Sequence, residues 1–523
     1  MAFSRRKFIH WAASASTLAL TVPDGIADAS GFRPDLVPTQ KETWDNLLWM
    51  AKLGPKYTGN PAHVQFVEFL AKNLQSLGLE VNRDRYTLPR WDARRTEITI
   101  HPSSGADFKV PVTSYYPYSG KTPPEGVTGE IAYVGTFASI DPGVTDHTRG
   151  RGGQAPASAP PQSPLKDLQG KIAFVECDVT PTNMQEWFRV RGGEPSNVSL
   201  PADHRTPVWG TVGMLTDFKK AGALGVILGW TDISDENAAD QYVPFGRAHQ
   251  DMPALYVGRA TSAKLKALVQ SGARATLVLE ADVTPDSSTD TLYASLPGVS
   301  SDELIVVQSH TDGPNALEEN GGIGVLALAK YFSQLPKTAR KRTLLFVLTT
   351  GHFAGAYVPS IRGFVQKHPD IVKKTVASLT IEHLGGRDWS DDAAMHYRPT
   401  GKNEIALAQT AFDSTAAVML ESLKGSGDLQ AAVVTPNQGH RWSGEGSGMN
   451  QAGVPSIGYI TIPSYLCAGP ANGCIERLSS DRLHAEIVVF AKAIHKMDGM
   501  SAAELKGAAR LNPKRSHAEI ELL

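Results

Sequence analysis

The sequence predicts an α/β fold with functional side chains at the carboxyl ends of its strands. The first observation is residues 304–332, where four apolar residues lead to His310, a turn rich in Gly, Pro and Asn follows, and an apolar helical pattern begins at Gly322. Two further apolar runs, residues 343–348 and 376–381, also end next to histidine or glutamate. Ligands bind at the carboxyl ends of strands in open α/β sheets. Three such strands in one half of the chain favour a functional site at one edge of the sheet.

Length and composition indicate a globular protein of several domains. The chain has 523 residues, of which 41% are hydrophobic and 20% charged, so it can bury a large core. This length suggests about two to four domains. A formal net charge of −2 gives no indication of a nucleic-acid partner. Beyond the N-terminal segment, no run approaches the roughly 18 apolar residues of a membrane span.

Residues 1–29 are expected to be an export signal and are excluded from the fold. Arg5 and Arg6 precede an apolar stretch of small residues, and Ala27-Asp28-Ala29 supplies a small-x-small cleavage site. Paired arginines before a weakly hydrophobic segment resemble a twin-arginine signal, which makes the twin-arginine export machinery an expected partner. The alternatives are an ordinary secretory signal and a cytosolic amphipathic helix. We predict an exported protein, periplasmic or secreted, with no membrane span after signal removal.

Export to an oxidising compartment makes the cysteines informative. Cys467 and Cys474 lie seven residues apart in a loop rich in Gly, Pro and Asn, and we predict a small disulfide between them. Cys177 stands at the end of an apolar strand pattern. A buried thiol is expected there rather than a nucleophile.

The mature chain begins with a helical pattern followed by strands. Residues 43–78 carry apolar side chains at three- and four-residue steps and end at Gly78, which predicts a helix closed by a C-cap glycine. His63 lies near the start of this pattern, where a surface or capping role is expected rather than that of a ligand. Residues 79–81 and 96–100 alternate in the manner of strands.

The middle of the chain, residues 119–285, repeats strand and helix patterns after a break at residues 120–126. Strands are expected at residues 129–135, 170–175, 225–229, 252–257 and 275–279, with helical patterns at residues 218–223 and 262–268. The segments "GKIAFV", "KKAGALGVIL" and "MPALYV" at these intervals resemble the protease-associated domain inserted into many exported aminopeptidases. The resemblance implies a non-catalytic module that shapes or covers the substrate entrance. The alternative is an independent α/β lobe of other function.

The rest of the chain carries a second set of motifs. They are the strand ending in HTD, a Glu-Asn pair before a Gly-rich helix, and the segments "LLFVLTTGHFAG", "LTIEHLGG" and "SGMNQAGVPSIGY". Together they resemble metallopeptidase family 28, the co-catalytic zinc group that includes bacterial leucyl aminopeptidase and glutamate carboxypeptidase. The resemblance implies a mostly parallel sheet sandwiched by helices. The predicted parts are a signal peptide (1–29), a peptidase-like domain (30–118 and 286–500), the inserted domain (119–285) and a C-terminal tail (501–523).

The resemblance implies an incomplete set of zinc ligands. The family's first-strand His-x-Asp corresponds to His310 and Asp312, and its metal-bridging carboxylate corresponds to Glu319. Its paired glutamates, a general base and a zinc ligand, correspond to His352 and Phe353. Phenylalanine cannot bind zinc. The last histidine ligand of the family is also missing, so a standard two-zinc centre is not expected.

The remaining donors can hold one divalent ion, which we predict to be zinc. The family's next carboxylate ligand corresponds to Glu382, with His383 beside it. The predicted ligands are His310, Glu319, Glu382 and His383, and Asp312 is predicted to orient the imidazole of His310. A bound ion lowers the pKa of its water towards about 7. His352 stands where the family keeps its base, so His352, Glu319 and Glu382 form the predicted catalytic set.

Residues ahead of the last motif are expected to bind substrate. Glu445 lies in a Ser/Gly-rich segment, where it can meet a substrate amine or hydroxyl, and His440 and Trp442 add polar and aromatic surface. The alternative for Glu445 is a loop carboxylate held by ion pairing.

The predicted function is an exported hydrolase of amide or peptide bonds that acts on a small molecule or short peptide. The alternatives are a metal-free acid/base enzyme on the same fold, such as a lyase or a cyclising acyltransferase, and a binding protein that has lost its chemistry. The residues that replace the family's ligands are His and Glu, which support proton chemistry. This favours an enzyme.

Overall fold

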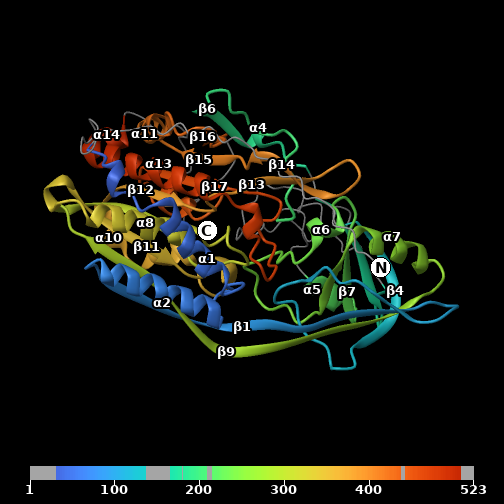
Figure 1. Ribbon diagram of the computed structural model, residues 1–523. Helices are drawn as coiled ribbons and strands as arrows, with labels where there is room; N and C mark the ends of the chain where they lie inside the picture. Colours follow the sequence, from blue (N-terminus) through green and yellow to red (C-terminus); the bar gives the residue numbers. More distant parts are fainter. Residues whose placement is uncertain are drawn as a thin grey trace, which may run out of the picture.

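The computed structural model describes residues 31–136, 165, 167–179, 181–208, 215–437 and 442–507. It has two lobes joined by a pair of long strands, β1 (Glu80–His101) and β9 (Arg274–Leu296) (Figure 1). The predicted signal segment 1–29 and His440 lie outside the described residues. None of the described helices is both long and apolar enough to cross a lipid bilayer.

The first lobe is built on four adjacent parallel strands in the order β11-β10-β12-β17. They are β11 (Arg342–Thr349), β10 (Ser300–His310), β12 (Thr375–Ile381) and β17 (Ser456–Thr461). Beyond β17 the sheet continues through β15 (Ala406–Thr410), β16 (Ala431–Pro436) and β6 (Phe188–Glu194). Parallel strands end at the same edge of a sheet, so the polar residues that follow β10, β11 and β12 are neighbours.

Helices cover both faces of this sheet, because successive residues of each buried strand point to opposite sides. Ile305 and Val307 belong to the large core, whereas Val306 belongs to a separate core on the other face. The large core is formed with α1 (Gln40–Ala51), α2 (Pro61–Ser76), α8 (Gly321–Ser333) and α13 (Ser480–Gly499). The other is formed with α9 (Ser360–Lys367), α10 (Pro369–Lys374) and α12 (Gly446–Gln451). The predicted α/β class, with a sheet between helices, is confirmed.

The helix predicted over residues 43–78 is two helices, α1 and α2. Residues 52–60 interrupt it, and the side chain of Asn60 begins α2 by accepting a hydrogen bond from the backbone N–H of His63. The ring of His63 is fully buried, with Nδ1 accepting from the N–H of Gly59 and Nε2 beside the Thr311 hydroxyl. The surface position expected for His63 is therefore wrong, because the break turns this residue inward.

The long strands β1 and β9 pair antiparallel along almost their whole lengths, from Glu80 opposite Ser295 to His101 opposite Arg274. The sequence predicted only two short strands in the β1 region, at residues 79–81 and 96–100, because the residues between these two strands are strongly charged. In place of apolar contacts, several charged side chains of β1 form ion pairs with β9. These pairs are Arg83–Asp290, Arg94–Asp282 and Arg95–Glu280. The predicted domain boundary between residues 285 and 286 falls within β9.

The second lobe has its own parallel sheet in the order β8-β7-β5-β4. Its strands are β4 (Val127–Thr136), β5 (Ile172–Cys177), β7 (Gly225–Trp230) and β8 (Ala254–Val257), and β3 (Ser114–Tyr115) pairs at the edge. The helices α5 (Thr216–Lys220) and α7 (Arg259–Val269) belong to this lobe (Figure 1). These elements coincide closely with the strands and helices expected from the sequence.

The disulfide predicted between Cys467 and Cys474, which both lie in the described part of the chain, is not formed. Both side chains are buried in the large core. Backbone hydrogen bonds close the intervening loop instead, such as those from Ala468 N to Tyr465 O and from Gly473 N to Pro470 O. Cys177 is buried at the end of β5, and burial raises the pKa of its thiol far above the usual value, as expected of a packed thiol.

Candidate metal centre

Histidine and glutamate side chains converge where the parallel strands end. His310 is the last residue of β10, His352 begins the 3₁₀ turn η3 (His352–Ala354) after β11, and Glu382 and His383 follow β12. The rings of His310 and His352 stack with centroids 4.3 Å apart, and those of His310 and His383 lie 5.9 Å apart. The structure thus brings together four side chains that the sequence assigned to the site.

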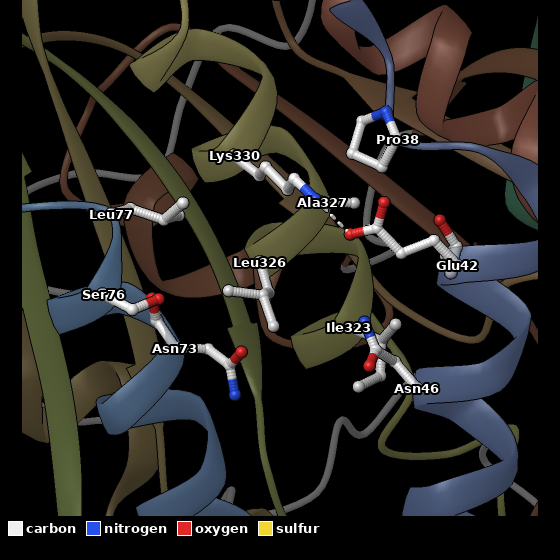
Figure 2. A pocket seen from close by; sticks show the side chains of 11 residues that line it. Pro38, Glu42, Asn46, Asn73, Ser76, Leu77, Ile323, Leu326, Ala327 and Lys330 are labelled. Carbon is white, nitrogen blue, oxygen red and sulfur yellow. Dashed lines mark hydrogen bonds and ion pairs between the residues drawn. The ribbon is translucent and has the colours of Figure 1, made fainter.

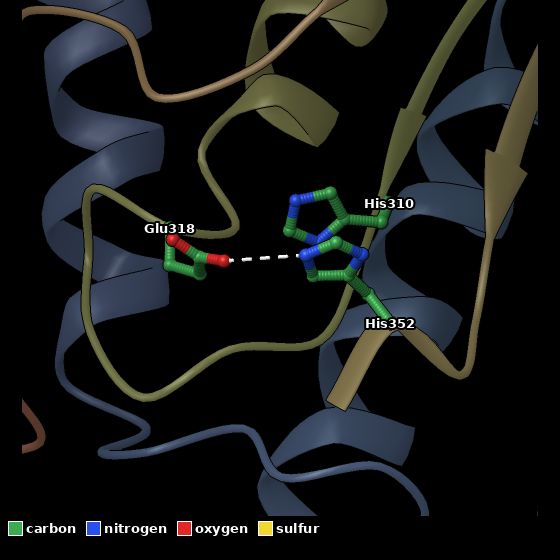
Figure 3. Close-up of side chains that lie close together, drawn as sticks. All are labelled: His310, Glu318 and His352. Carbon is green, nitrogen blue, oxygen red and sulfur yellow. Dashed lines mark ion pairs between the residues drawn. The ribbon is translucent and has the colours of Figure 1, made fainter. Parts of the chain in front are cut away.

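Glu318, in the loop between β10 and α8, completes this cluster (Figure 3). Its Oε1 lies 3.6 Å from Nε2 of His352 and its Oε2 lies 3.1 Å from Nε2 of His383. Nε2 of His310 lies 3.6 Å from Oε2 of Glu382. The side chains of Glu318, Glu382, His310 and His383 are almost completely buried, whereas that of His352 is 15% exposed. We call these five residues the histidine–glutamate cluster.

The Nδ1 atom of each imidazole is held by an oxygen that can only accept. In His310 it lies 2.9 Å from the carbonyl oxygen of Asp312, and in His383 it lies 2.6 Å from that of Thr461. In His352 it lies 2.7 Å from Oε1 of Glu445. Each Nδ1 must therefore carry the proton, which leaves the Nε2 of a neutral ring as a lone-pair donor. Oxygen partners on the outer nitrogen are also the usual arrangement around metal-binding histidines.

Lone pairs consequently face one another inside the histidine–glutamate cluster. Nε2 of His310 and His383, both oxygens of Glu318 and Oε2 of Glu382 have no hydrogen-bond partner among the described residues. Unpaired acceptors in a buried site are costly. A positive charge between the nitrogens and the oxygens, either protons or a metal ion, makes the arrangement favourable.

The geometry of the cluster fits a metal ion. Two groups offer ligand atoms within 4.8 Å of one another, His310 with Glu318 and His352, and His310 with Glu382 and His383. Bonds of about 2.0–2.2 Å place two ligands of tetrahedral zinc about 3.3 Å apart. The nitrogen–oxygen separations of 3.1 and 3.6 Å lie close to this value. Imidazole and carboxylate are ligands that zinc accepts.

Glu319, predicted as a ligand and a catalytic residue, lies in neither group because it is paired elsewhere. Its Oε1 lies 2.6 Å from Nζ of Lys56, and both side chains are buried. Burial raises the pKa of Glu319 to about 7, against the opposing effect of Lys56. The neighbouring Glu318 takes the place predicted for Glu319. Sequence reasoning could not separate the two, since both lie in one irregular loop.

Asp312, predicted to orient His310, contacts that ring through its backbone carbonyl rather than its carboxylate. The carboxylate accepts from the N–H groups of Gly351, His352 and Phe353, and from the hydroxyl of Thr58. It therefore holds the turn after β11 against the end of β10. Asp312 fixes the position of His352 relative to His310.

Glu445, predicted to bind substrate, is buried and bonded within the protein. Besides His352, it accepts from the Ser360 hydroxyl and the Ile361 N–H. Its position matches the ion-pairing alternative more closely than a substrate contact. Trp442 is half-buried, and its ring covers Gly446 and Gly458.

Burial and charge displace the pKa values of the cluster. Burial raises the pKa of Glu382 to about 7, and burial together with the other imidazoles lowers the pKa of His310 well below its usual value. Burial opposes the charged form of His352, but its bond to Glu445 and that carboxylate's charge raise the pKa to about 9. Burial likewise opposes protonation of His383, yet Glu318 raises its pKa. The raised pKa values of Glu382, His352 and His383 agree with a site that attracts positive charge, whereas the lowered pKa of His310 keeps its ring neutral.

A segment of the second lobe completes the surroundings of His352. The ring of Phe245 stacks on Phe353 with centroids 4.2 Å apart and lies 5.2 Å from the ring of His352. Backbone hydrogen bonds from Gly246 N to Phe353 O and from Ala356 N to Gly246 O fix this contact. No sequence pattern predicted this contact, because residues 245 and 353 are distant in the chain.

A separate hollow of about 130 Å³ lies between α1, α2 and α8 (Figure 2). The ion pair between Glu42 and Lys330 spans it, and the other lining residues are apolar or amide and hydroxyl side chains. It contains no residue of the histidine–glutamate cluster.

The architecture is similar to that of solved aminopeptidases and a solved peptidase. A zinc aminopeptidase from Bacillus subtilis superposes with a TM-score of 0.60 at 14% identity, covering 90% of this chain and 98% of that one. The Peptidase M28 precursor from Shewanella amazonensis SB2B gives 0.60 at 16% identity, covering 91% and 95%. The aminopeptidase from Aneurinibacillus sp. strain AM-1 gives 0.55 at 15% identity, covering 87% and 93%.

No family model matches the sequence, and no curated protein matches it. The structural likeness therefore establishes the fold, and the chemistry has to be argued from the residues of this chain.

Replacement of Glu445 by Gln should lower the pKa of His352 in the metal-free protein. The carboxylate stabilises the imidazolium, so without its charge burial dominates and we expect a fall of about one to two pH units. NMR titration of the ring signals measures this pKa. Ser360→Ala, which leaves the carboxylate in place, is the control and should keep the pKa of His352 at about 9. An unchanged pKa in Glu445→Gln would contradict the assignment of Glu445 as the partner of His352.

Proposed function

We propose that this protein is a hydrolase of peptide or related amide bonds that works with one divalent ion, zinc. The ion would be held by His310, His383, Glu382 and Glu318, the four buried members of the histidine–glutamate cluster. The observation that carries the proposal is the set of unpaired Nε2 and carboxylate atoms that face one another at ligand spacing. The shared architecture with zinc aminopeptidases supports the choice of reaction.

The five residues of the histidine–glutamate cluster have two proposed roles. Four are metal ligands, and His352 is the proton carrier. When bound, zinc acts as a Lewis acid and lowers the pKa of a coordinated water molecule to about 7. His352 is the cluster residue with accessible surface, and its Nδ1–H is fixed on Glu445. In the metal-free protein the pKa of His352 is about 9, so Nε2 carries a proton near neutral pH. The charge of a bound zinc ion would lower this pKa, so that Nε2 can take a proton from a nucleophile and return it to a leaving amine. Asp312 keeps His352 in this position by capping its turn.

A row of aromatic side chains leads from Phe245, which lies beside His352, through Phe353 and Tyr242 to Tyr57. Tyr57 stacks on Tyr242 with centroids 4.0 Å apart, and Tyr242 lies 5.9 Å from Phe353. Tyr57 and Tyr242 also line a hollow of about 220 Å³ that both lobes contribute to. With Phe245 over the edge of His352, we propose that these rings bind the apolar side chain next to the scissile bond.

We also propose that the protein is exported, on the evidence of the paired arginines and the small-x-small site in residues 1–29. Arg5→Lys combined with Arg6→Lys should abolish the periplasmic fraction in a host with twin-arginine machinery, because that machinery reads the arginine pair. Immunoblots of cell fractions measure the outcome, with Lys7→Arg as the control. Undiminished export of the double variant would point to an ordinary secretory signal.

Metal analysis tests the proposed centre. The purified protein should contain about one equivalent of a divalent ion, and a chelator should remove the ion together with activity on a panel of amide substrates. His310→Ala should lose the ion. His352→Gln should keep it while kcat falls by about a hundredfold or more, because only the proton carrier is changed. Full turnover by metal-free protein would overturn the proposal and favour acid/base catalysis without an ion.

Phe245→Ala tests the proposed substrate surface. Removing the ring opens space beside His352, so we expect the ratio of kcat/KM for bulky over small side chains to rise at least about tenfold. Steady-state kinetics on amides of increasing side-chain size measure the ratio. Phe108→Ala, in the same lobe but away from His352, should leave it unchanged. An unaltered ratio for Phe245→Ala would remove this segment from the substrate site.

A further inference from the structure

The number of donors does not limit the histidine–glutamate cluster to one ion. Two groups of three donors share His310, so five side chains offer more ligand atoms than a single tetrahedral ion needs. The number of ions must be set by something else. Charge is the remaining constraint, because the donors are buried and uncompensated charge is costly there.

Five carboxylates lie in or beside the cluster, and three of them are compensated by the protein. Asp312 accepts three backbone N–H groups and a hydroxyl. Glu445 accepts from His352, Ser360 and a backbone N–H. Glu319 is paired with Lys56. The two carboxylates that remain are Glu318, whose oxygens have no hydrogen-bond partner among the described residues, and Glu382, which accepts one backbone N–H, that of Glu445, on Oε1. When both are ionised, their combined charge of about −2 equals that of one divalent cation in magnitude.

Lys56 is placed to act as a permanent internal cation. The residue is fully buried, and lysine is almost never so unless its charge is paired. Its Nζ lies 2.6 Å from Oε1 of Glu319, 2.7 Å from the carbonyl oxygen of Gly54 and 3.2 Å from that of Met50. The two carbonyl oxygens accept hydrogen bonds from the ammonium group, and the contact with Glu319 is an ion pair.

The backbone fixes Lys56 against the loop that carries the cluster. Lys56 N donates to Gly313 O over 2.8 Å, and Gly313 N donates back to Lys56 O over 3.0 Å. Gly313 lies against both glutamates of the loop. A Cβ built on it would come within 2.6 Å of Oε2 of Glu319 and of Cγ of Glu318. The backbone of Lys56 is thus fixed to the loop that carries both glutamates, and its charged Nζ lies at Glu319.

We propose that Lys56 sets the metal stoichiometry at one by forming an ion pair with Glu319. Without this pair, Glu319 would be a third uncompensated carboxylate. The inference rests on the proposed one-ion centre and assigns to Lys56 a positioning role, outside the reacting atoms. With Lys56 present, the two open carboxylates balance one divalent ion. Without its charge, Glu319 and Glu318 together attract a second ion, for which His352 supplies a nitrogen donor.

The test is metal binding by Lys56→Met, which keeps the length of the side chain and removes its charge. Metal-free protein is titrated with zinc, and the bound ion is counted by calorimetry and by elemental analysis after gel filtration. We expect about one equivalent in the wild type and about two in Lys56→Met. Lys56→Arg, which retains the charge, and the double variant Lys56→Met with Glu319→Gln, which removes the pair, should each bind about one.

The outcomes separate this inference from the proposed function. A wild type that binds no zinc overturns the proposed function. A wild type that binds one ion, together with a Lys56→Met variant that also binds one, overturns the role of Lys56 alone. If Lys56→Met does not fold, Glu319→Gln decides, because it leaves an unpaired ammonium beside the ion and should weaken zinc binding at least about tenfold. Unchanged affinity in that variant overturns the role of Lys56.

Discussion

The site depends on one electrostatic constraint, namely that imidazole nitrogens and carboxylate oxygens without other hydrogen-bond partners in the described residues face one another in a closed interior. The oxygens around the periphery impose it, since the carbonyls of Asp312 and Thr461 and the carboxylate of Glu445 take the outer proton of each ring. Asn320 adds to this rigidity by exchanging hydrogen bonds with both backbone groups of Leu384. These hydrogen bonds therefore hold nitrogen and oxygen lone pairs facing one another, which is what a cation site requires.

Sequence reasoning predicted side chains that the structure does bring together, because the rule for strand ends depends only on local pattern. His310, His352, Glu382 and His383 each follow an apolar run, and parallel pairing of β10, β11 and β12 brings such positions together. The choice between Glu318 and Glu319 could not be made in this way. It depends on which side chain a loop turns towards the strands, and on a lysine that lies about 260 residues earlier in the chain.

The larger architecture was predictable to a similar degree. The α/β class and the strands of the second lobe follow from apolar runs of ordinary length. The extent of β1 and β9 does not, because their central parts are held by cross-strand ion pairs such as Arg94–Asp282, which carry no apolar periodicity. The contact of Phe245 with His352 was equally invisible, since it depends on how the two lobes meet.

The pairing of β1 with β9 restricts how the two lobes can move relative to each other. These two strands run from one lobe into the other and are paired by backbone hydrogen bonds along the way (Figure 1). The lobes are therefore connected by a two-stranded ribbon and not by a flexible linker. A swinging motion of one lobe would have to bend this ribbon and detach residues 245 and 246 from the turn they rest on. Access to His352 then requires only small local displacements around Phe245, while the histidine–glutamate cluster keeps its geometry.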